Sequence, residues 1–568
     1  MNLDLRYLGR SGAVETASGV SLRLSPNLAR PKVFYDAELA SPVRFREAIS
    51  ALHEVVVGDL RFKKRDKSGY REFLKEREAE EQRLRVAVLE RARREAALEL
   101  AAPRPPTGAE AGGSRVEMGL RFKAMHLMYT AAWHAWGQEV WATELVRHLI
   151  AFDPVVTVAP DCVFFEAFAK DESSYGCLYV DRGAFRGETG AGLGTTNVDY
   201  SPALFQHLQS LRSYRNTRLQ VDPQGFEVQV QGHADLREEK IDLPSSWLRG
   251  FGQLQAAMAL PSRRVVVPVE AVYSVLAYLR RHREKSGPRS LRFQLVPGRV
   301  PVIVLDPWGV SIVCHGAPVW DGKPEEIKVW GRRRLFALAR LLPLAEKIEV
   351  RLLGSGLPSV WSVSMGEMRF VLALSGWTAN DWSSGAALEG LGKHRAASPA
   401  LVANASRHLE ALKSANLAAL VKAVAAPEPE VVGALHTLAK QGQAVYDFAA
   451  QTYRWRPVMP VALSEAVLGP EPEEVVAGKI LYFEDQLKLG PAALPPTPSQ
   501  KREGGTKFTA QVRGVPCQAT FDLDGGLSKA QCDCSHFYKF RLRKGPCRHL
   551  LALKLAVQAR LAAQQGTA

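Results

Sequence analysis

Long apolar runs are missing from this chain of 568 residues. No stretch of about 18 uncharged apolar residues occurs, so the sequence predicts no membrane-spanning helix. No apolar segment follows the first six residues, so we expect no signal peptide. Cysteine is scarce: the whole chain has seven, and three of them lie in one short stretch near the C-terminus. This usage does not build a disulfide framework, and we expect a reducing, cytoplasmic compartment.

The signatures of common catalytic sites are missing as well. The chain has no HExxH pair, no G-x-S-x-G turn and no P-loop. The glycine-rich stretch Gly187–Thr196 lacks a P-loop lysine, so we interpret it as a flexible turn. The acidic residues Asp161, Glu166, Asp171 and Glu172 are interpreted as surface loop residues, because no apolar strand runs directly into the last two. The sequence therefore predicts no enzyme and no small-molecule substrate.

Positive charge is what the chain has in excess. Its 74 Lys and Arg outnumber its 59 Asp and Glu, which gives 74 − 59 = +15. Such an excess favours polyanionic partners, although a moderately basic protein without such a partner is the alternative. The length exceeds the ~250–300 residues that one hydrophobic core usually serves, so several domains are expected.

Four potential metal ligands lie close together near the C-terminus, with the spacing C-x-C-x12-C-x-H. Zinc favours thiolate and imidazole donors in a tetrahedral set of four. In a strand, residues i and i+2 point to one face, so Cys532 and Cys534 can converge on one ion. Cys547 and His549 fit where a loop enters the first turn of a helix, which we expect from Leu550 onward. We predict one structural Zn²⁺ held by these four residues.

Two alternatives to this ligand set stay open. The cysteines could be ordinary buried thiols or a disulfide pair, and His536 could compete as a ligand. Cys517 is interpreted as a small core residue of an earlier strand. Strands are expected at Lys507–Arg513, Pro516–Asp522 and Leu527–Gln531, with a turn at 524–526, so the unit reads as βββα.

The ligand spacing, the apolar helix that follows and the run Pro546-Cys-Arg-His-Leu-Leu-Ala552 resemble the SWIM-type zinc finger family. The resemblance is confined to about residues 507–560. It implies zinc binding and a role in DNA or protein interaction, with no catalysis by the finger itself. Family members occur in bacterial helicase-like remodelling ATPases, in transposase-derived plant proteins and in a signalling kinase. An adaptor subunit for a separately encoded ATPase is therefore the alternative to nucleic-acid binding.

The spacer between the two ligand pairs is basic and aromatic. Residues 501–560 hold 12 Lys and Arg against 4 Asp and Glu. Cations can contact phosphates and aromatic rings can stack on bases, whereas the alternative is a small apolar cluster with solvated charges. The residues interpreted as binding nucleic acid are Lys539, Arg541, Arg543, Lys544, Phe537 and Tyr538.

The composition predicts a multi-domain α+β protein. We expect an N-terminal α+β segment at 1–66, a charged helical arm and Pro/Gly-rich linker at 67–117, a central α+β region of perhaps two subdomains at 118–395, a mainly helical region at 396–490, a linker at 491–506 and the zinc unit at 507–568.

The helical region 396–490 loosely resembles a winged helix, with helices followed by a hairpin near Gln443–Pro457. Alternation places Tyr453 and Trp455 on one face of that hairpin and Arg454 and Arg456 on the other. As a wing, the two arginines would approach phosphates. The alternative, which we favour, leaves them in solvent above an aromatic core.

Overall fold

The computed structural model describes residues 12–16, 19–24, 33–57, 154–198, 202–221, 245–258, 260–284, 288–376, 381–383, 388–392, 397–458, 472–490, 506–521 and 527–565, with single residues 90, 94 and 126. The chain divides into two compact units, Met1–Leu60 with Phe152–Ala568, and Arg61–Ala151. The arm and linker predicted at 67–117 lie outside the described residues, apart from two. These two, Glu90 and Arg94, form an ion pair at 3.5 Å one helical turn apart, the pattern expected for the arm.

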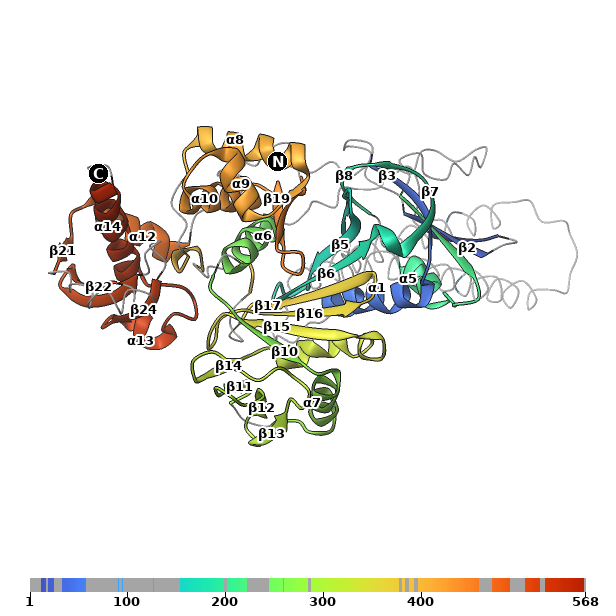
Figure 1. Ribbon diagram of the computed structural model, residues 1–568, viewed down its shortest axis with the longest axis horizontal. Helices are drawn as coiled ribbons and strands as arrows, with labels where there is room; N and C mark the ends of the chain where they lie inside the picture. The colour runs from blue at the N-terminus through green and yellow to red at the C-terminus, as the bar shows by residue number, and fades with distance from the viewer. Residues whose placement is uncertain are drawn as a thin grey trace, which may run out of the picture. The chain divides into compact units, whose positions relative to one another are not determined.

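The first unit contains both strands and helices, so the predicted α+β class is confirmed (Figure 1). Its largest sheet has eight strands, and all neighbours within it are antiparallel. The order is β10 (Arg263–Val267), β15 (Lys347–Leu352), β16 (Ser359–Met365), β17 (Met368–Leu374), β6 (Ser174–Asp181), β5 (Cys162–Phe168), β4 (Val155–Val158) and β8 (Gly194–Asn197).

Two helices cover the centre of this sheet, α1 (Pro42–Val57) and α6 (Ser245–Met258). Phe45 of α1 contacts Phe165, with ring centroids 5.8 Å apart, and Phe251 of α6 contacts Phe168 at 5.0 Å. Since side chains alternate along a strand, residues 165 and 168 face opposite sides of the sheet. Strand β5 is therefore buried on both faces, which explains its continuous apolar sequence.

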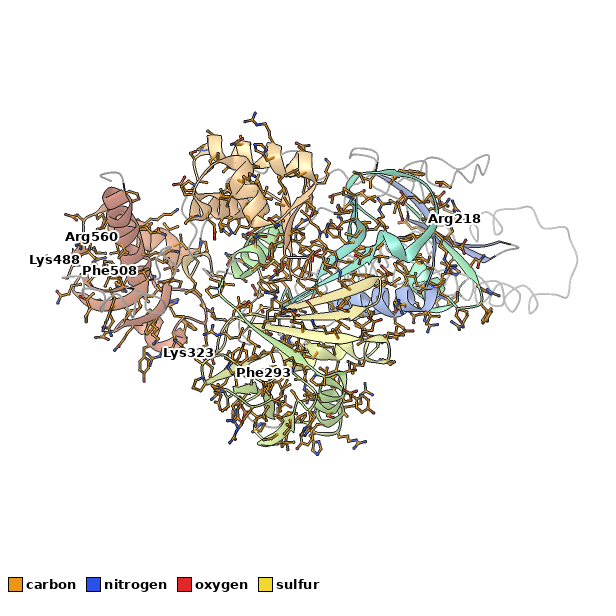
Figure 2. All side chains as sticks on the ribbon, viewed as in Figure 1. Arg218, Phe293, Lys323, Lys488, Phe508 and Arg560 are labelled. Atoms are coloured by element: carbon orange, nitrogen blue, oxygen red, sulfur yellow. The ribbon has the colours of Figure 1, made fainter. Side chains whose placement is uncertain are left out.

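A five-stranded sheet and a four-stranded sheet accompany the large one. The five-stranded order is β1 (Gly12–Thr16), β2 (Gly19–Leu24), β9 (Asn216–Val221), β3 (Phe34–Leu39) and β7 (Phe185–Gly192). The four-stranded order is β13 (Val310–Val313), β12 (Val302–Leu305), β11 (Leu291–Leu295) and β14 (Glu325–Val329). Phe293 of β11 is fully buried, and its ring centroid lies 6.1 Å from that of Trp361 in the large sheet (Figure 2).

Short helical elements connect these sheets. They are η2 (Arg182–Ala184), α5 (Pro202–Gln209), α7 (Val269–Arg281), η3 (Arg332–Leu338), η4 (Leu342–Leu344) and η5 (Leu388–Gly390). Of these elements, η3 and η4 are 3₁₀ helices. Across the described ranges, no helix combines the length and apolar character that crossing a membrane requires.

Two interpretations made from the sequence are wrong. Gly187–Thr196 is not a flexible turn, because it forms most of β7 and β8, and β7 pairs with β3 about 150 residues earlier in the chain. The interpretation of the acidic cluster as surface loop residues is wrong for two of its four members, whereas Asp161 is exposed. Glu166 is fully buried within β5, and Asp171 is 6% exposed and pairs with Arg334 at 3.0 Å. Both errors arise because the segments that pair with these residues or cover them lie far away in the sequence.

Residues 397–458 form a helical module with its own core. Its elements are α8 (Pro399–Leu412), β18 (Ser414–Ala415), α9 (Leu417–Val424), α10 (Glu428–Lys440), β19 (Ala444–Asp447) and β20 (Thr452–Trp455). Side chains cap two of the helices: the Ser398 hydroxyl accepts the Leu401 N–H at 3.3 Å, and Asn416 accepts the Ala419 N–H at 2.8 Å. The described order is three helices, with β18 between the first two, followed by the hairpin of β19 and β20.

The hairpin of this module does not offer arginines to a nucleic acid, and it does not leave them in solvent. Arg454 and Arg456 are 1% and 0% exposed. Arg454 donates to both carboxylate oxygens of Asp161, at 2.7 and 2.9 Å, and pairs with Asp447 at 2.9 Å. Arg456 pairs with the buried Glu166 at 3.2 Å. Both arginines therefore join the module to the large sheet instead of contacting an external partner.

The C-terminal elements form a finger unit, residues 472–490 and 506–565. Its elements are α12 (Glu473–Phe483), β21 (Leu487–Leu489), β22 (Thr506–Val512), β23 (Val515–Phe521), β24 (Leu527–Cys532), α13 (Ser535–Phe540) and α14 (Arg548–Gln565). The three expected strands and the C-terminal helix are present, and β21 extends the sheet to four antiparallel strands. Helix α12 packs on α14. The unit thus begins at about residue 472 and has elements on both sides of the linker predicted at 491–506. Most of that linker lies outside the described residues.

Candidate metal centre

The first ligand pair lies where a strand turns into a helix. Cys532 is the last residue of β24, and Cys534 is the N-cap residue of α13. The Cys534 sulfur accepts the backbone N–H of Phe537 at 3.3 Å, which fixes the direction of its side chain. Asp533 between them donates its N–H to the carbonyl of Pro516 at 3.3 Å. Both sulfurs are therefore held by backbone structure.

The second pair lies at the start of α14, where the sequence predicted it. Cys547 immediately precedes the helix, and its carbonyl accepts the Leu551 N–H at 3.0 Å. His549 follows in the first turn. Gly545 has φ +85°, a left-handed conformation that a residue with a Cβ rarely adopts. This turn brings the chain into Cys547.

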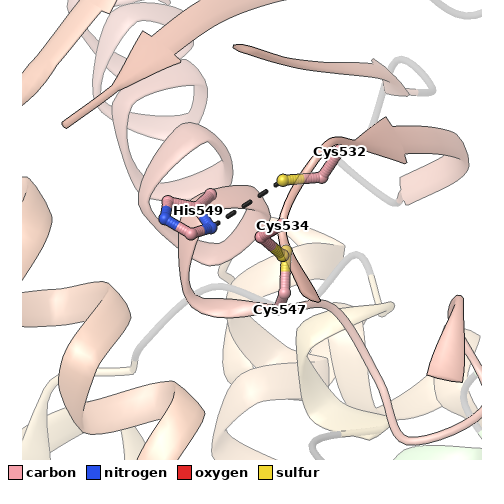
Figure 3. A group of neighbouring side chains, drawn as sticks. All are labelled: Cys532, Cys534, Cys547 and His549. Carbon is pink, nitrogen blue, oxygen red and sulfur yellow. Dashed lines mark hydrogen bonds between the residues drawn. The ribbon is translucent and has the colours of Figure 1, made fainter. Parts of the chain in front are cut away.

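The four side chains converge on one point (Figure 3). Their ligand atoms all lie within 4.8 Å of one another, and the Cys532 sulfur is 3.8 Å from Nδ1 of His549. A tetrahedron with zinc–sulfur bonds of ~2.3 Å has edges of roughly 3.8 Å. Cys532 and Cys547 are 4% and 0% exposed, so bulk water does not compete for this position. The cluster is able to hold one zinc ion.

The structure bears on the disulfide alternative and on the His536 alternative to this ligand set. All seven cysteines are free thiols, so no disulfide occupies the site. His536 does not join the cluster: its Nδ1 lies 3.5 Å from the Glu474 carboxylate. Cys517 is a buried residue of β23, 5% exposed, as the sequence predicted.

Residues 511–558 match the family model of the SWIM zinc finger. These residues form a SWIM zinc finger. The match covers the end of β22, all of β23 and β24, the four ligands and most of α14, and it agrees with the resemblance drawn from the ligand spacing. It does not extend to the rest of the chain, and no curated protein matches the chain.

The chain is also similar to solved structures of proliferating cellular nuclear antigen. The protein from Entamoeba histolytica is 10% identical, the similarity covers 40% of this chain and 89% of that one, and the TM-score is 0.28. For the protein from Thermococcus kodakaraensis the values are 12% identity, 39% and 90% coverage, and 0.27. TM-scores this low support no conclusion about fold or function.

One carboxylate outside the matched segment connects the elements around the SWIM zinc finger's metal centre. Glu474 of α12 accepts the backbone N–H of Arg548 at 2.7 Å and its side-chain Nε at 3.1 Å. A carboxylate at the N-terminus of α14 also complements the helix dipole. The same carboxylate faces His536 of α13. Sequence reasoning missed Glu474, because nothing in its local sequence marks a contact 74 residues away.

The three thiols of the SWIM zinc finger cannot all ionise without a cation beside them. The hydrogen bond from Cys547 lowers the pKa of Cys532 to about 4, against the opposing effect of burial. The same hydrogen bond, together with burial, raises the pKa of Cys547. Burial raises the pKa of Cys534. A divalent cation supplies the positive charge that stabilises the remaining thiolates.

Zinc binding should therefore release protons and strengthen with pH. The raised pKa values of Cys534 and Cys547 keep both thiols protonated at neutral pH until metal displaces their protons, whereas Cys532 is already ionised. Each proton that zinc displaces makes the apparent affinity fall about tenfold per pH unit lowered, so the protons of Cys534 and Cys547 alone give at least about a hundredfold. Competition with a chromophoric chelator at several pH values measures this slope. A slope near zero would contradict ligation by these thiols.

The aromatic residues of the spacer differ in exposure. Tyr538 is 79% exposed, whereas Phe537 is 3% exposed and packs inside the finger. The stacking role expected of Phe537 is therefore wrong, because no face of its ring is available. The ring of Phe540 lies between two cations, with Nζ of Lys539 at 5.0 Å and Nζ of Lys544 at 4.9 Å from its centroid. These cation–π contacts hold the two lysines over the same ring.

The arginines of the spacer differ in their contacts. Arg541 is exposed, with its guanidinium 5.4 Å from the ring of Phe537. Arg543 donates to the carbonyls of Phe540 and Lys539, at 3.1 and 3.2 Å, and so caps the end of α13. Arg543 therefore supports the loop, whereas Lys539 and Arg541 are exposed and Lys544 is half-buried.

Proposed function

We propose that the SWIM zinc finger binds nucleic acid through α13 and the loop that follows it. The observation that carries this proposal is the exposed ring of Tyr538 beside the exposed cations Lys539 and Arg541. Among the described residues, no carboxylate pairs with Lys539, Arg541 or Lys544. Cations without a carboxylate partner are available to phosphates, and an exposed ring can stack on a base.

The zinc ion has a structural part in this proposal. Four protein ligands close the coordination shell, so zinc holds β24, α13 and the start of α14 together and leaves no position for a substrate. The residues that contact nucleic acid then project from a rigid turn. The proposal assigns no catalytic step to the finger.

The salt dependence of binding tests the proposal. Replacing Lys539, Arg541 and Lys544 with alanine should flatten the slope of log K against log salt for a mixed-sequence duplex by up to ~2.7, because each phosphate contact contributes ~0.9. Tyr538→Ala should weaken binding of a single strand by ~1–3 kcal/mol and leave duplex binding nearly unchanged. Fluorescence anisotropy titrations at four salt concentrations measure both effects.

A matched control separates this surface from general positive charge. The variant R186A/R299A/R407A also removes three exposed arginines, none of them in the finger, and should leave the slope close to that of the wild type. Zinc content must equal the wild-type value in every variant. If the finger variant binds both nucleic acids with wild-type affinity and slope, the proposal is wrong.

Wild-type binding of both nucleic acids by the finger variant would favour the alternative function, a protein adaptor. One face of α12 exposes three apolar side chains: Val476 is 39% exposed, Ile480 48% and Phe483 79%. Their spacing of four and three residues places them on one side of the helix. A defined protein that co-purifies with the chain through high salt, and is lost in I480S/F483S, would support an adaptor function.

A further inference from the structure

A second basic surface lies outside the finger, in a cavity of about 570 Å³ where α7 ends beside η3. We call it the arginine pocket. Its charged and titratable lining residues are Arg280, Arg283, Arg333, Arg340, His282 and Glu54. The lining thus has four guanidinium groups against one carboxylate. A volume of ~300–1,000 Å³ is typical of sites for small ligands.

Nearby carboxylates neutralise only part of this charge. The Glu284 carboxylate is shared by three arginines: its oxygens lie 2.9 Å from Arg333, 3.3 Å from Arg332 and 3.7 Å from Arg289. Arg340 is 3.4 Å from Glu47, which is itself paired with another arginine. One negative charge divided among several guanidiniums leaves a local excess of positive charge.

Two arginines of the pocket have no such partner. Arg280 and Arg283 are exposed, and no carboxylate of the described residues forms an ion pair with either. Basic residues in the last turn of a helix complement its dipole, which accounts for Arg280 alone. It does not account for Arg283, which lies beyond α7, or for Arg333 and Arg340, which come from other segments.

The pocket also has apolar walls and fixed groups. The ring of Phe336 lies 5.9 Å from the Arg280 guanidinium. Arg333 donates to the carbonyls of Leu279 and His282, both at 3.3 Å, and is held in place there. The His282 ring stacks on that of Tyr278 with centroids 3.9 Å apart. A concave site with oriented guanidiniums suits the fork-shaped, bidentate recognition of phosphate.

We propose that the arginine pocket binds a phosphate-bearing ligand, with Arg280 and Arg283 as its principal contacts. The phosphate can belong to a small phosphorylated molecule or to the backbone of a nucleic acid. The chemistry recognised is the same in both cases. The proposal does not depend on the function of the finger, because none of its residues lies in the finger unit.

Opposite charge changes in the full-length protein provide the test. R280A/R283A should weaken binding of inorganic pyrophosphate by about tenfold or more, because charge-assisted hydrogen bonds are lost. E54Q removes the one lining carboxylate and should tighten the same binding by about twofold or more. R186A/R299A removes two exposed arginines elsewhere and should bind as the wild type does. Isothermal titration calorimetry in phosphate-free buffer measures all four proteins.

A second probe distinguishes the source of the phosphate. The same variants are titrated with a mixed-sequence duplex in a background that carries alanine at Lys539, Arg541 and Lys544, so that the finger surface does not contribute. If R280A/R283A loses pyrophosphate binding, the ligand is a small phosphorylated molecule. If it loses only duplex binding, the ligand is the phosphate backbone of a nucleic acid. Equal affinity of R280A/R283A and R186A/R299A for both probes overturns the proposal. An E54Q variant that binds neither probe more tightly than the wild type also overturns the proposal. Circular dichroism must show that every variant is folded.

Discussion

Replacing Cys547 with serine should unfold the metal-binding part of the finger unit while the large sheet stays folded. Cys547 is fully buried and is one of the four residues of the ligand cluster. Structural zinc contributes ~10–16 kcal/mol of binding free energy in small finger peptides, and that energy is coupled to folding. Removal of zinc with a strong chelator should have the same effect.

Hydrogen exchange measured by mass spectrometry resolves this effect by region. Peptides from 527–565 should lose protection in C547S, and those from β5 and β6 should keep it. Cys517→Ala is the matched control, because Cys517 is a buried thiol of the same sheet that lies outside the ligand cluster. It should retain zinc and most of its protection. Unchanged protection in C547S would mean that the metal does not hold this unit together.

Replacing Arg456 with alanine should destabilise the first unit by about 3–5 kcal/mol, because it leaves the partner charge buried and unpaired. Both Arg456 and Glu166 are fully buried and lie 3.2 Å apart. The Arg456 guanidinium also lies 3.9 Å from the ring centroid of Phe251, and Tyr175 donates to Glu166 at 2.6 Å. Burial raises the pKa of Glu166, so its carboxyl should take up a proton once Arg456 is gone.

A double variant distinguishes the effect of losing the ion pair from the effect of losing side-chain volume. E166Q/R456M removes both charges and keeps similar volumes, so it should recover a large part of the stability lost in R456A. Arg407→Ala, at an exposed position of the same module, should change stability by less than about 0.5 kcal/mol. Urea unfolding followed by tryptophan fluorescence compares the four proteins. A cost below about 1 kcal/mol for R456A, typical of a surface ion pair, would contradict the burial described for this pair.

The ligand set was predictable because its geometry is local. Cys532 ends a strand and Cys534 caps the next helix, while Cys547 and His549 lie where the chain enters α14, so the backbone within a few residues directs each pair. The arginines of the hairpin show the opposite case. Alternation correctly placed Arg454 and Tyr453 on opposite faces of the hairpin. Whether the Arg454 face is exposed to solvent, however, depends on Asp161, which lies 293 residues earlier. Sequence periodicity gives the faces of a strand and does not say which segment covers each face.

The extent of the finger unit could not be predicted for the same reason. Strand β21 lies just before a Pro-rich stretch, which was interpreted as a linker between domains. It nevertheless pairs with β22, which follows that stretch. Glu474 binds Arg548 across 74 residues. Lys554 of α14 is buried and donates to the carbonyls of Gly390 and Gly392, at 3.0 and 2.6 Å. These contacts connect the finger to segments that cannot be predicted from the spacing of the four ligands.

The zinc content of the full chain tests the central claim most directly, since the account rests on one ion held by Cys532, Cys534, Cys547 and His549. The protein should be purified without chelator and analysed by inductively coupled plasma mass spectrometry, beside C547S and C517A. We predict one zinc per chain in the wild type and in C517A, and a loss of most zinc in C547S. A wild-type protein without zinc, or a C547S variant with unchanged zinc, would contradict the account.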